Sequence, residues 1–242
     1  MLTEKERDEL APTGVLRAAI NFGNTVLAQR GADGAPTGIA VDLATEFASR
    51  TGLGLDIVPF EAAGILFEAL KPGAWDIAFL AIDPVREAQI AFTSPYAMIE
   101  GTYMVPASSP LRTPRDVDAP GMRVSVGPGS AYDLFLSRTL AHARIVRAPR
   151  GGSAAMIDLF VAERLDAAAG VRAWLDAYAA AHPGYRVMEE AFMEIGQAIG
   201  VPKGRSHARD LLEAFVTDMK TSGFVAQALA RSGQTAKVPP AG

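Results

Sequence analysis

The sequence contains no cysteine in its 242 residues. This absence excludes disulfide bonds, thiolate metal sites, a cysteine nucleophile and lipid attachment through a cysteine, although it assigns no compartment. The three histidines, His142, His182 and His207, fall at a predicted helix end, a turn and a loop, without the spacing of metal ligands. We therefore expect neither a metal site nor a cofactor.

An excess of positive charge is also missing, because 23 Lys and Arg residues face 27 Asp and Glu residues and the formal net charge is -4. Without a positive field to collect phosphates, nucleic acid is not an expected partner. No stretch approaches the roughly 18 apolar residues of a membrane span. Residues 1–10 are mostly charged, unlike a secretory signal. We expect a cytoplasmic protein if Met1 is the native start, and a trimmed export signal otherwise.

The motifs of three common enzyme classes are absent. The glycine-rich segments 127–129 and 151–152 are not followed by the Gly-Lys-Ser/Thr of a Walker loop, and residues 14–23 lack the spacing of a dinucleotide fingerprint. No Gly-x-Ser-x-Gly elbow occurs either. We assign no catalytic residue, although acid–base chemistry by the carboxylates Asp83 and Glu100 stays open.

The remaining composition is that of an ordinary globular chain, with 49% apolar and 21% charged residues. At about 150 residues per domain, the chain forms one large domain or two small ones. Apolar segments typical of buried parallel strands alternate with amphipathic segments typical of helices, which predicts the α/β class. The predicted strands are 16–20, 55–59, 75–82, 102–105, the beginning of 124–130, 144–147, 165–169 and 197–201. The predicted helices are 38–52, 65–70, 132–140, 154–164, 171–181, 209–221 and 224–231, followed by a frayed tail at 235–242.

The alternation of strands and helices occurs twice, which predicts two α/β halves. In a parallel sheet, ligands bind outside the carboxyl ends of the strands, and in the first half these ends fall near 21–24 and 81–86. A cleft between two such halves is a favoured place for a small-molecule site.

Short motifs in a fixed order resemble the solute-binding proteins of bacterial polar-amino-acid ABC transporters. The order is the specific signal, since any one motif alone is weak. The resemblance covers 14–233. The motifs are LRAAIN at 16–21, GAWDI at 73–77, Arg86 followed by IAFTSPY at 90–96, RVSVGPGS at 123–130, ERLD at 163–166, and GVPKG at 200–204 followed by SGF at 222–224.

This family, the extracellular solute-binding proteins of family 3, implies a type II periplasmic-binding-protein fold. Each lobe is then a mainly parallel sheet flanked by helices, and two crossing segments let the lobes close on a solute. Lobe one would comprise 1–98 and 197–242, and lobe two 101–193, with hinges at about 98–101 and 193–197. The resemblance also implies a periplasmic monomer that captures a small amino-acid-like or carboxylate solute in the inter-lobe cleft for an ABC permease in the membrane.

The resemblance implies two groups that bind a carboxylate. Arg86 occupies the place of the family's carboxylate clamp, which suits a planar guanidinium. The turn at Ser130 and Ala131 opens a helix, whose N-terminus attracts an anion. The alternatives are a surface arginine and a serine that only caps its helix. Further candidate ligand-binding residues are Asn24, Ala81 and Tyr132.

The chain departs from the family where the solute's ammonium group is held. Asn21 and Val171 stand where the family commonly has aspartates. A buried ammonium without a carboxylate is costly, so Glu100 or Asp83 would have to substitute. Arg172 is either a second cation, which favours a carboxylate solute without an amine, or a solvated helix residue.

Two alternative functions stay open at this point. Some enzymes resemble this fold, notably cyclohexadienyl dehydratases, so a lyase on the same scaffold is one alternative. A cytoplasmic small-molecule sensor is the other. Only about fourteen residues precede the first predicted strand, too few for a helix-turn-helix that reads DNA.

Overall fold

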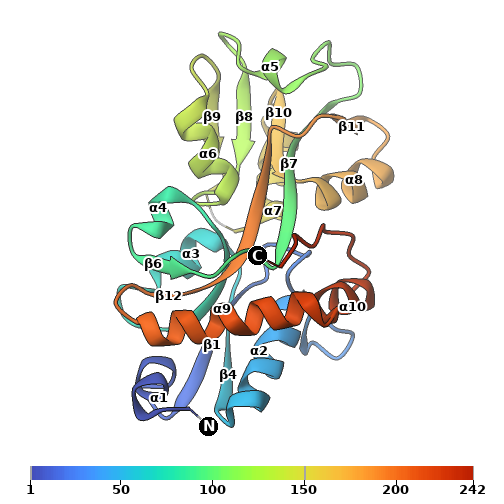
Figure 1. The fold of residues 1–242 in the computed structure, drawn as a ribbon. Coiled ribbons are helices and arrows are strands. Elements are labelled where there is room, and N and C mark those ends of the chain that lie inside the picture. Colours follow the sequence, from blue (N-terminus) through green and yellow to red (C-terminus); the bar gives the residue numbers. More distant parts are fainter. Residues whose placement is uncertain (1, 150, 242) are drawn as a thin grey trace. The chain divides into compact units, whose positions relative to one another are not determined.

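The computed structural model describes residues 2–149 and 151–241, and the chain divides into two compact units (Figure 1). The main part of unit 2 begins after Met98 and ends at Ile195. Both units combine paired strands with helices, which confirms the predicted α/β class. Unit 1 comprises Met1–Glu61, Ile65–Met98 and Gly196–Gly242, and unit 2 comprises Ala62–Gly64 and Ile99–Ile195.

The strands of unit 1 follow the order β4-β1-β5-β12. β4 and β5 pair in parallel with β1, while β12 pairs antiparallel with β5 and with β6. β5 is buried along its whole length, as expected for a strand covered on both faces. The bounds are β1 (Val15–Asn21), β4 (Gly54–Phe60), β5 (Ile77–Ala81), β6 (Ile90–Phe92) and β12 (Met193–Pro202), with a separate hairpin of β2 (Gln29–Arg30) and β3 (Pro36–Thr37).

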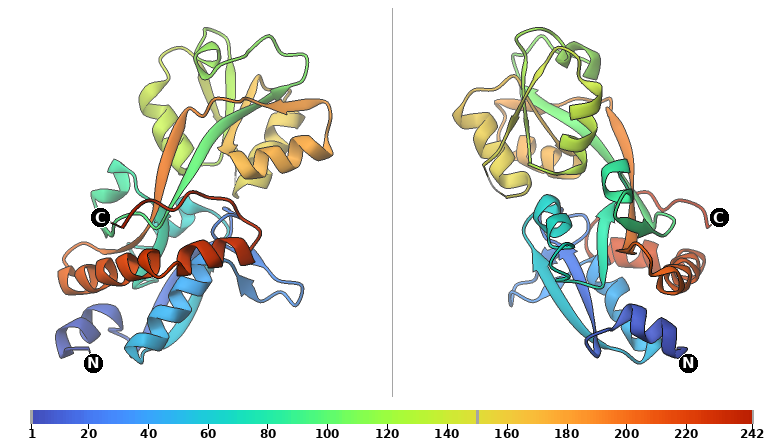
Figure 2. Two further views of the ribbon diagram at one scale, coloured as in Figure 1. Left: turned by 45° about the vertical axis from the view of Figure 1, so that its right-hand side comes forward. Right: turned by 90° about the vertical axis from the view of Figure 1, so that its left-hand side faces the viewer.

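Local capping residues set one boundary of each of two helices of unit 1, the end of α2 and the beginning of α1. α2 ends at Gly52, whose φ of 69° is left-handed backbone that glycine adopts without steric cost. α1 begins with a capping box between Thr3 and Glu6. Figure 2 shows α1 beside the first turns of α9. The bounds are α1 (Glu4–Leu10), α2 (Ile39–Thr51), α3 (Ala63–Glu68, across the unit boundary), α4 (Pro84–Glu87), α9 (Ser206–Thr221) and α10 (Phe224–Arg231).

The strands of unit 2 follow the order β7-β10-β8-β9. β8 pairs in parallel with β10 and β9, and β7 pairs antiparallel with β10 and β11. Tyr103 and Met104 are neighbours on β7 and enter different hydrophobic clusters, because successive side chains of a strand point to opposite faces. The bounds are β7 (Ala97–Pro106), β8 (Arg123–Val126), β9 (Arg144–Arg147), β10 (Ala167–Val171), β11 (Tyr185–Val187), α5 (Pro114–Val117), α6 (Ala131–Thr139), α7 (Ser153–Ala162) and α8 (Arg172–Ala181).

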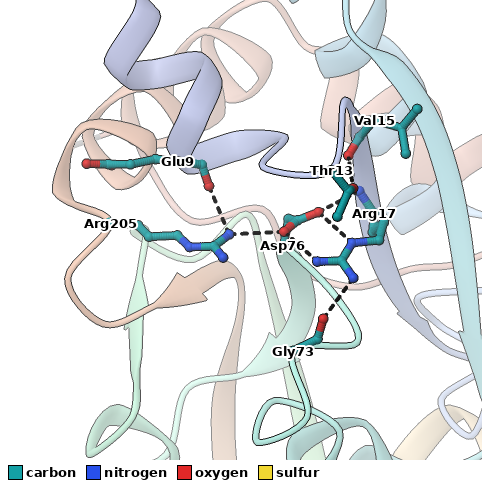
Figure 3. Close-up of polar contacts among 7 residues, drawn as sticks. All are labelled: Glu9, Thr13, Val15, Arg17, Gly73, Asp76 and Arg205. Atoms are coloured by element: carbon teal, nitrogen blue, oxygen red, sulfur yellow. Dashed lines mark hydrogen bonds and ion pairs between the residues drawn. The ribbon is translucent and has the colours of Figure 1, made fainter.

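A buried polar cluster joins distant segments of unit 1 (Figure 3). Asp76 is fully buried and accepts hydrogen bonds from Arg17 Nε at 2.9 Å and from Arg205 Nη1 at 3.1 Å. Arg205 Nη1 also donates to the Glu9 carbonyl oxygen at 2.8 Å. Burial opposes the charge of the Glu9 carboxylate, but its hydrogen bond from the amide of Ala208 helps to keep the Glu9 pKa below the usual range. The cluster thereby ties α1 to the beginning of α9.

Several predictions of local structure are wrong. The strand expected at 165–169 lies at Ala167–Val171, so Val171 ends the strand and Arg172 begins the helix. The crossing strands β7 and β12 are ten residues long, where only 102–105 and 197–201 were expected. The C-terminal segment is not frayed where the structure describes it, because the Lys237 carbonyl oxygen accepts from Met98 N at 2.7 Å. Among the described residues, no helix is both long and apolar enough to cross a membrane.

Candidate functional site

Arg86 is fully buried in unit 1, which contradicts its interpretation as a surface arginine. It belongs to the short helix α4, which begins directly after β5 with Asp83 as its N-cap. The guanidinium turns back toward the strand, and its Nη1 donates to the Ala81 carbonyl oxygen at 2.8 Å. A buried guanidinium is stable only among polar partners, and its planar fork of donors matches the two oxygens of a carboxylate.

The two candidate asparagines lie at the carboxyl end of β1. Asn21 Oδ1 accepts from Gly23 N at 3.0 Å, and Asn24 Oδ1 accepts from Val26 N at 3.2 Å, so both side chains shape the loop that follows the strand. Both are buried. Because β1 and β5 are adjacent and parallel, their carboxyl ends share one edge of the sheet. Five candidates therefore gather at this edge of unit 1: Asn21, Asn24, Ala81, Asp83 and Arg86.

Asp83 has a structural task besides its candidate role as a partner of an ammonium group. It is buried, and its Oδ1 accepts from Val85 N at 2.9 Å. This bond caps α4, the turn that carries Arg86. The aspartate thus helps to position the arginine.

In unit 2, Ser130 caps α6, as one of the two sequence interpretations holds. Its Oγ accepts from Asp133 N at 3.1 Å. Asp133 in turn accepts from Gly129 N at 2.9 Å and forms an ion pair with Arg147 at 2.8 Å. This buried carboxylate within the first turn of α6 weakens the attraction of the helix N-terminus for a second anion.

Ala131 and Tyr132, the first residues of α6, are both buried. The Tyr132 ring packs edge-on against Phe192, with centroids 6.0 Å apart. Gly101 on β7 makes room for this ring, since a Cβ there would lie 2.6 Å from Tyr132 Cε1. This role of Gly101 could not be predicted from the sequence, because a lone glycine on a strand carries no signal of the ring that packs against it.

Glu100 and Arg172 form an ion pair with each other. They meet because β7 and β10 pair with Gly101 opposite Val171. The Arg172 side chain is 26% exposed and also donates to the carbonyl oxygens of Met188 and Glu189, which contradicts its interpretation as a solvated helix residue. Since each charge faces the other, the pair offers a solute less net charge than either residue alone.

The ten predicted residues thus form one group in each unit. The group of unit 1 surrounds the carboxyl ends of β1 and β5. The group of unit 2 lies at the beginning of α6 and at the Gly101–Val171 pair: Glu100, Ser130, Ala131, Tyr132 and Arg172. No cluster of three His, Asp or Glu side chains suited to a metal ion occurs within the described residues.

Comparison with known proteins reveals a likeness that covers most of the chain. Residues 23–234 match the sequence model of the bacterial extracellular solute-binding proteins, family 3. Among curated protein sequences, none matches this chain.

Solved structures with a similar fold cover nearly the whole chain. A mutant of ArgBP from T. maritima is 22% identical, with a TM-score of 0.79 over 94% of this chain and 99% of its own. The cysteine-binding protein from Campylobacter jejuni is 19% identical, with a TM-score of 0.80 over 96% and 93%. An ancestral amino-acid-binding protein, a precursor of cyclohexadienyl dehydratase, is 22% identical, with a TM-score of 0.76 over 93% and 97%. These likenesses confirm the predicted two-lobed fold.

Proposed function

Since the chain belongs to the bacterial extracellular solute-binding proteins of family 3, we propose that it captures a small amino-acid-like or carboxylate solute for an ABC permease. Membership of the family establishes solute binding. The proposal adds the chemical class of the solute. The similar solved structures include an arginine-bound ArgBP from T. maritima, a cysteine-binding protein from Campylobacter jejuni and a binding component from Wolinella succinogenes complexed with lysine. These amino acids share a carboxylate, which is the group that a guanidinium recognises best. In keeping with the family, the proposed place of action is the periplasm.

The observation that carries the proposal is the buried Arg86 at the carboxyl edge of the unit 1 sheet. Nη1 is directed to the Ala81 carbonyl oxygen and Asp83 fixes the turn, so the guanidinium is held in one orientation. A binding group that is already oriented loses little conformational freedom when the solute arrives. In this proposal Arg86 binds the solute's carboxylate.

The other candidates take supporting roles in the proposal. Asn21 and Asn24 hold the loop after β1 and contribute amide hydrogen bonds. In unit 2, Ser130 holds the turn at the beginning of α6, while the backbone amide of Ala131 and the Tyr132 ring contribute polar and apolar contacts to the solute. Each unit thus supplies binding groups of its own.

Mass spectrometry of small molecules released from gently purified, then denatured wild-type protein tests the proposal. Each released compound, the twenty standard amino acids and succinate are then added back in thermal-shift titrations. A solute present at about 100 times its Kd should stabilise the fold by about 2.7 kcal/mol. The proposal is supported if a compound that carries a carboxylate stabilises the protein and is recovered unchanged. It is contradicted if none of these compounds stabilises the protein.

An enzyme on this scaffold is the alternative that the same experiment separates. The likeness to the precursor of a cyclohexadienyl dehydratase motivates it, while the family as a whole favours binding without turnover. Incubation of the stabilising compound with the protein, followed by mass spectrometry, decides between the two. A compound recovered unchanged supports a binding protein, and conversion to a product moves the assignment to a lyase.

A further inference from the structure

Arg172 connects three elements of unit 2 through one guanidinium. It is the first residue of α8, and it forms an ion pair with Glu100 on β7. Its Nη1 donates to the Met188 carbonyl oxygen at 3.0 Å, and its Nη2 donates to the Glu189 carbonyl oxygen at 2.8 Å. A planar guanidinium can serve several acceptors in this way because its donors point in fixed, diverging directions.

The segment 188–192 that receives these bonds is also attached to β7 by its backbone. Met188 N donates to the Tyr103 carbonyl oxygen and Phe192 N to the Gly101 carbonyl oxygen, both at 2.9 Å. The buried Thr102 adds a side-chain link, since its Oγ1 donates to the carbonyl oxygens of Met188 at 3.2 Å and Glu190 at 2.8 Å. The Met188 carbonyl oxygen thus accepts from Thr102 and Arg172.

Through these two attached segments the chain enters and leaves the main part of unit 2, Ile99–Ile195. Residues 99–103 of β7 follow the crossing after Met98, and 188–192 lead into β12 and the return crossing after Ile195. Little room is left between them, because a Cβ at Gly101 would lie 2.9 Å from Met193 Cγ. Any group that fixes 188–192 on β7 therefore fixes both connections at the unit 2 end.

We propose that Arg172 is a positioning residue for solute binding: it locks the two connecting segments of unit 2 together through the carbonyl oxygens of 188 and 189, and it does not bind the solute. Only the consequence for affinity rests on the proposed function. The locking itself is a property of the free protein. Glu100 orients the guanidinium, while the bonds to the two carbonyl oxygens hold the segments.

Hydrogen exchange in the solute-free protein tests the lock directly. Arg172→Met keeps the length of the side chain and removes all its hydrogen bonds, so the amides of Met188 and Phe192 should exchange at least about tenfold faster. Arg123→Met is the matched control: Arg123 donates to the Arg164 carbonyl oxygen and lies 3.8 Å from Asp166, away from both segments. This control should leave the two amides unchanged, and unchanged exchange in Arg172→Met overturns the proposal.

Affinity measurements separate positioning from direct contact. The probe is whichever of the twenty amino acids or succinate stabilises the wild type most. If Arg172 acts by position, Arg172→Met weakens binding by the same factor from about 0.05 to 0.5 M salt, and the control Arg123→Met leaves affinity unchanged. If the guanidinium touches an anionic solute, the loss of affinity in Arg172→Met shrinks as the salt concentration rises, which overturns the proposal. If no probe binds the wild type, the proposed function fails. The exchange experiment still tests whether Arg172 holds the segment 188–192 on β7.

Discussion

The candidate arginines of the two units differ in how the fold uses them. Arg86 in unit 1 is fully buried, and its Nη1 donates to the Ala81 carbonyl oxygen of the same turn. Arg172 in unit 2 is 26% exposed and faces the carboxylate of Glu100, itself 50% exposed. Removing the partners of a buried charge costs more free energy than removing the partner of a half-exposed charge, whose ion pair is screened by water. A charged residue in a predicted binding region can therefore be assigned to solute recognition only when its partners within the protein are known.

A second contrast concerns what stabilises each unit. Unit 1 buries a carboxylate, Asp76, among arginines from two distant segments. Unit 2 holds its exposed loop at 141–143 through the carboxylate of Asp118, which accepts from three backbone amides. The buried network of unit 1 should cost more to break than the polar contacts of unit 2. Four experiments test these contrasts.

The largest effect is expected for Asp76→Asn. The substitution removes the charge that Arg17 and Arg205 share, and we expect a loss of about 3 kcal/mol in the free energy of unfolding. Chemical denaturation measures this loss. Glu61→Gln is the control, because the exposed ion pair of Glu61 with Arg30 should cost less than about 1 kcal/mol. Equal losses for the two variants would remove the contrast between buried and exposed charges.

Arg86→Met should weaken binding of the solute released from the wild type by at least tenfold, or about 1.4 kcal/mol. The reason is the loss of the oriented fork of donors at the carboxyl edge of unit 1. Calorimetry measures the affinity, with Arg86→Lys retaining the charge but not the fork. Circular dichroism and thermal melts establish that each variant is folded. A folded Arg86→Met variant with wild-type affinity rules out the carboxylate clamp.

Helices and strands were predicted well from the sequence where neighbouring residues determine their bounds. The helix expected at 38–52 was found at Ile39–Thr51, because its apolar spacing and the stop at Gly52 both act locally. α1 was missed because its residues are almost all polar, so it has no apolar period to detect. It is held by Arg205 and the amide of Ala208, which are close only in the folded chain.

The candidate site was harder to predict because its chemistry depends on long-range pairing. Glu100 and Arg172 are 72 positions apart, and only the register that sets Gly101 opposite Val171 brings them together. A single sequence does not carry that register. The burial of Arg86 is similar: the sequence left a surface arginine as the alternative, and only the folded chain makes that position an interior one.

Glu100→Gln should have a small effect on stability. The glutamate is 50% exposed, and its partner Arg172 keeps its bonds to the carbonyl oxygens of Met188 and Glu189. We expect the free energy of unfolding to change by less than about 1 kcal/mol. Urea denaturation at about 0.15 M salt measures it. A loss as large as that of Asp76→Asn would show that this half-exposed pair is as important to unit 2 as the buried network is to unit 1.

The smallest effect depends on pH and concerns Asp118. Its hydrogen bonds from the amides of Ala141, Ala143 and His142 lower its pKa below the usual aspartate range. A carboxyl whose pKa is depressed by folding adds stability that is complete above its unfolded pKa of about 4 and fades as pH falls through the folded value. Wild type should therefore be more stable than Asp118→Asn at pH 6, and the difference should shrink below about pH 4. Urea titrations from about pH 6 to 2.5 measure both curves, and a constant difference would show that the charge of Asp118 does not stabilise the loop, leaving hydrogen-bond geometry alone to hold it.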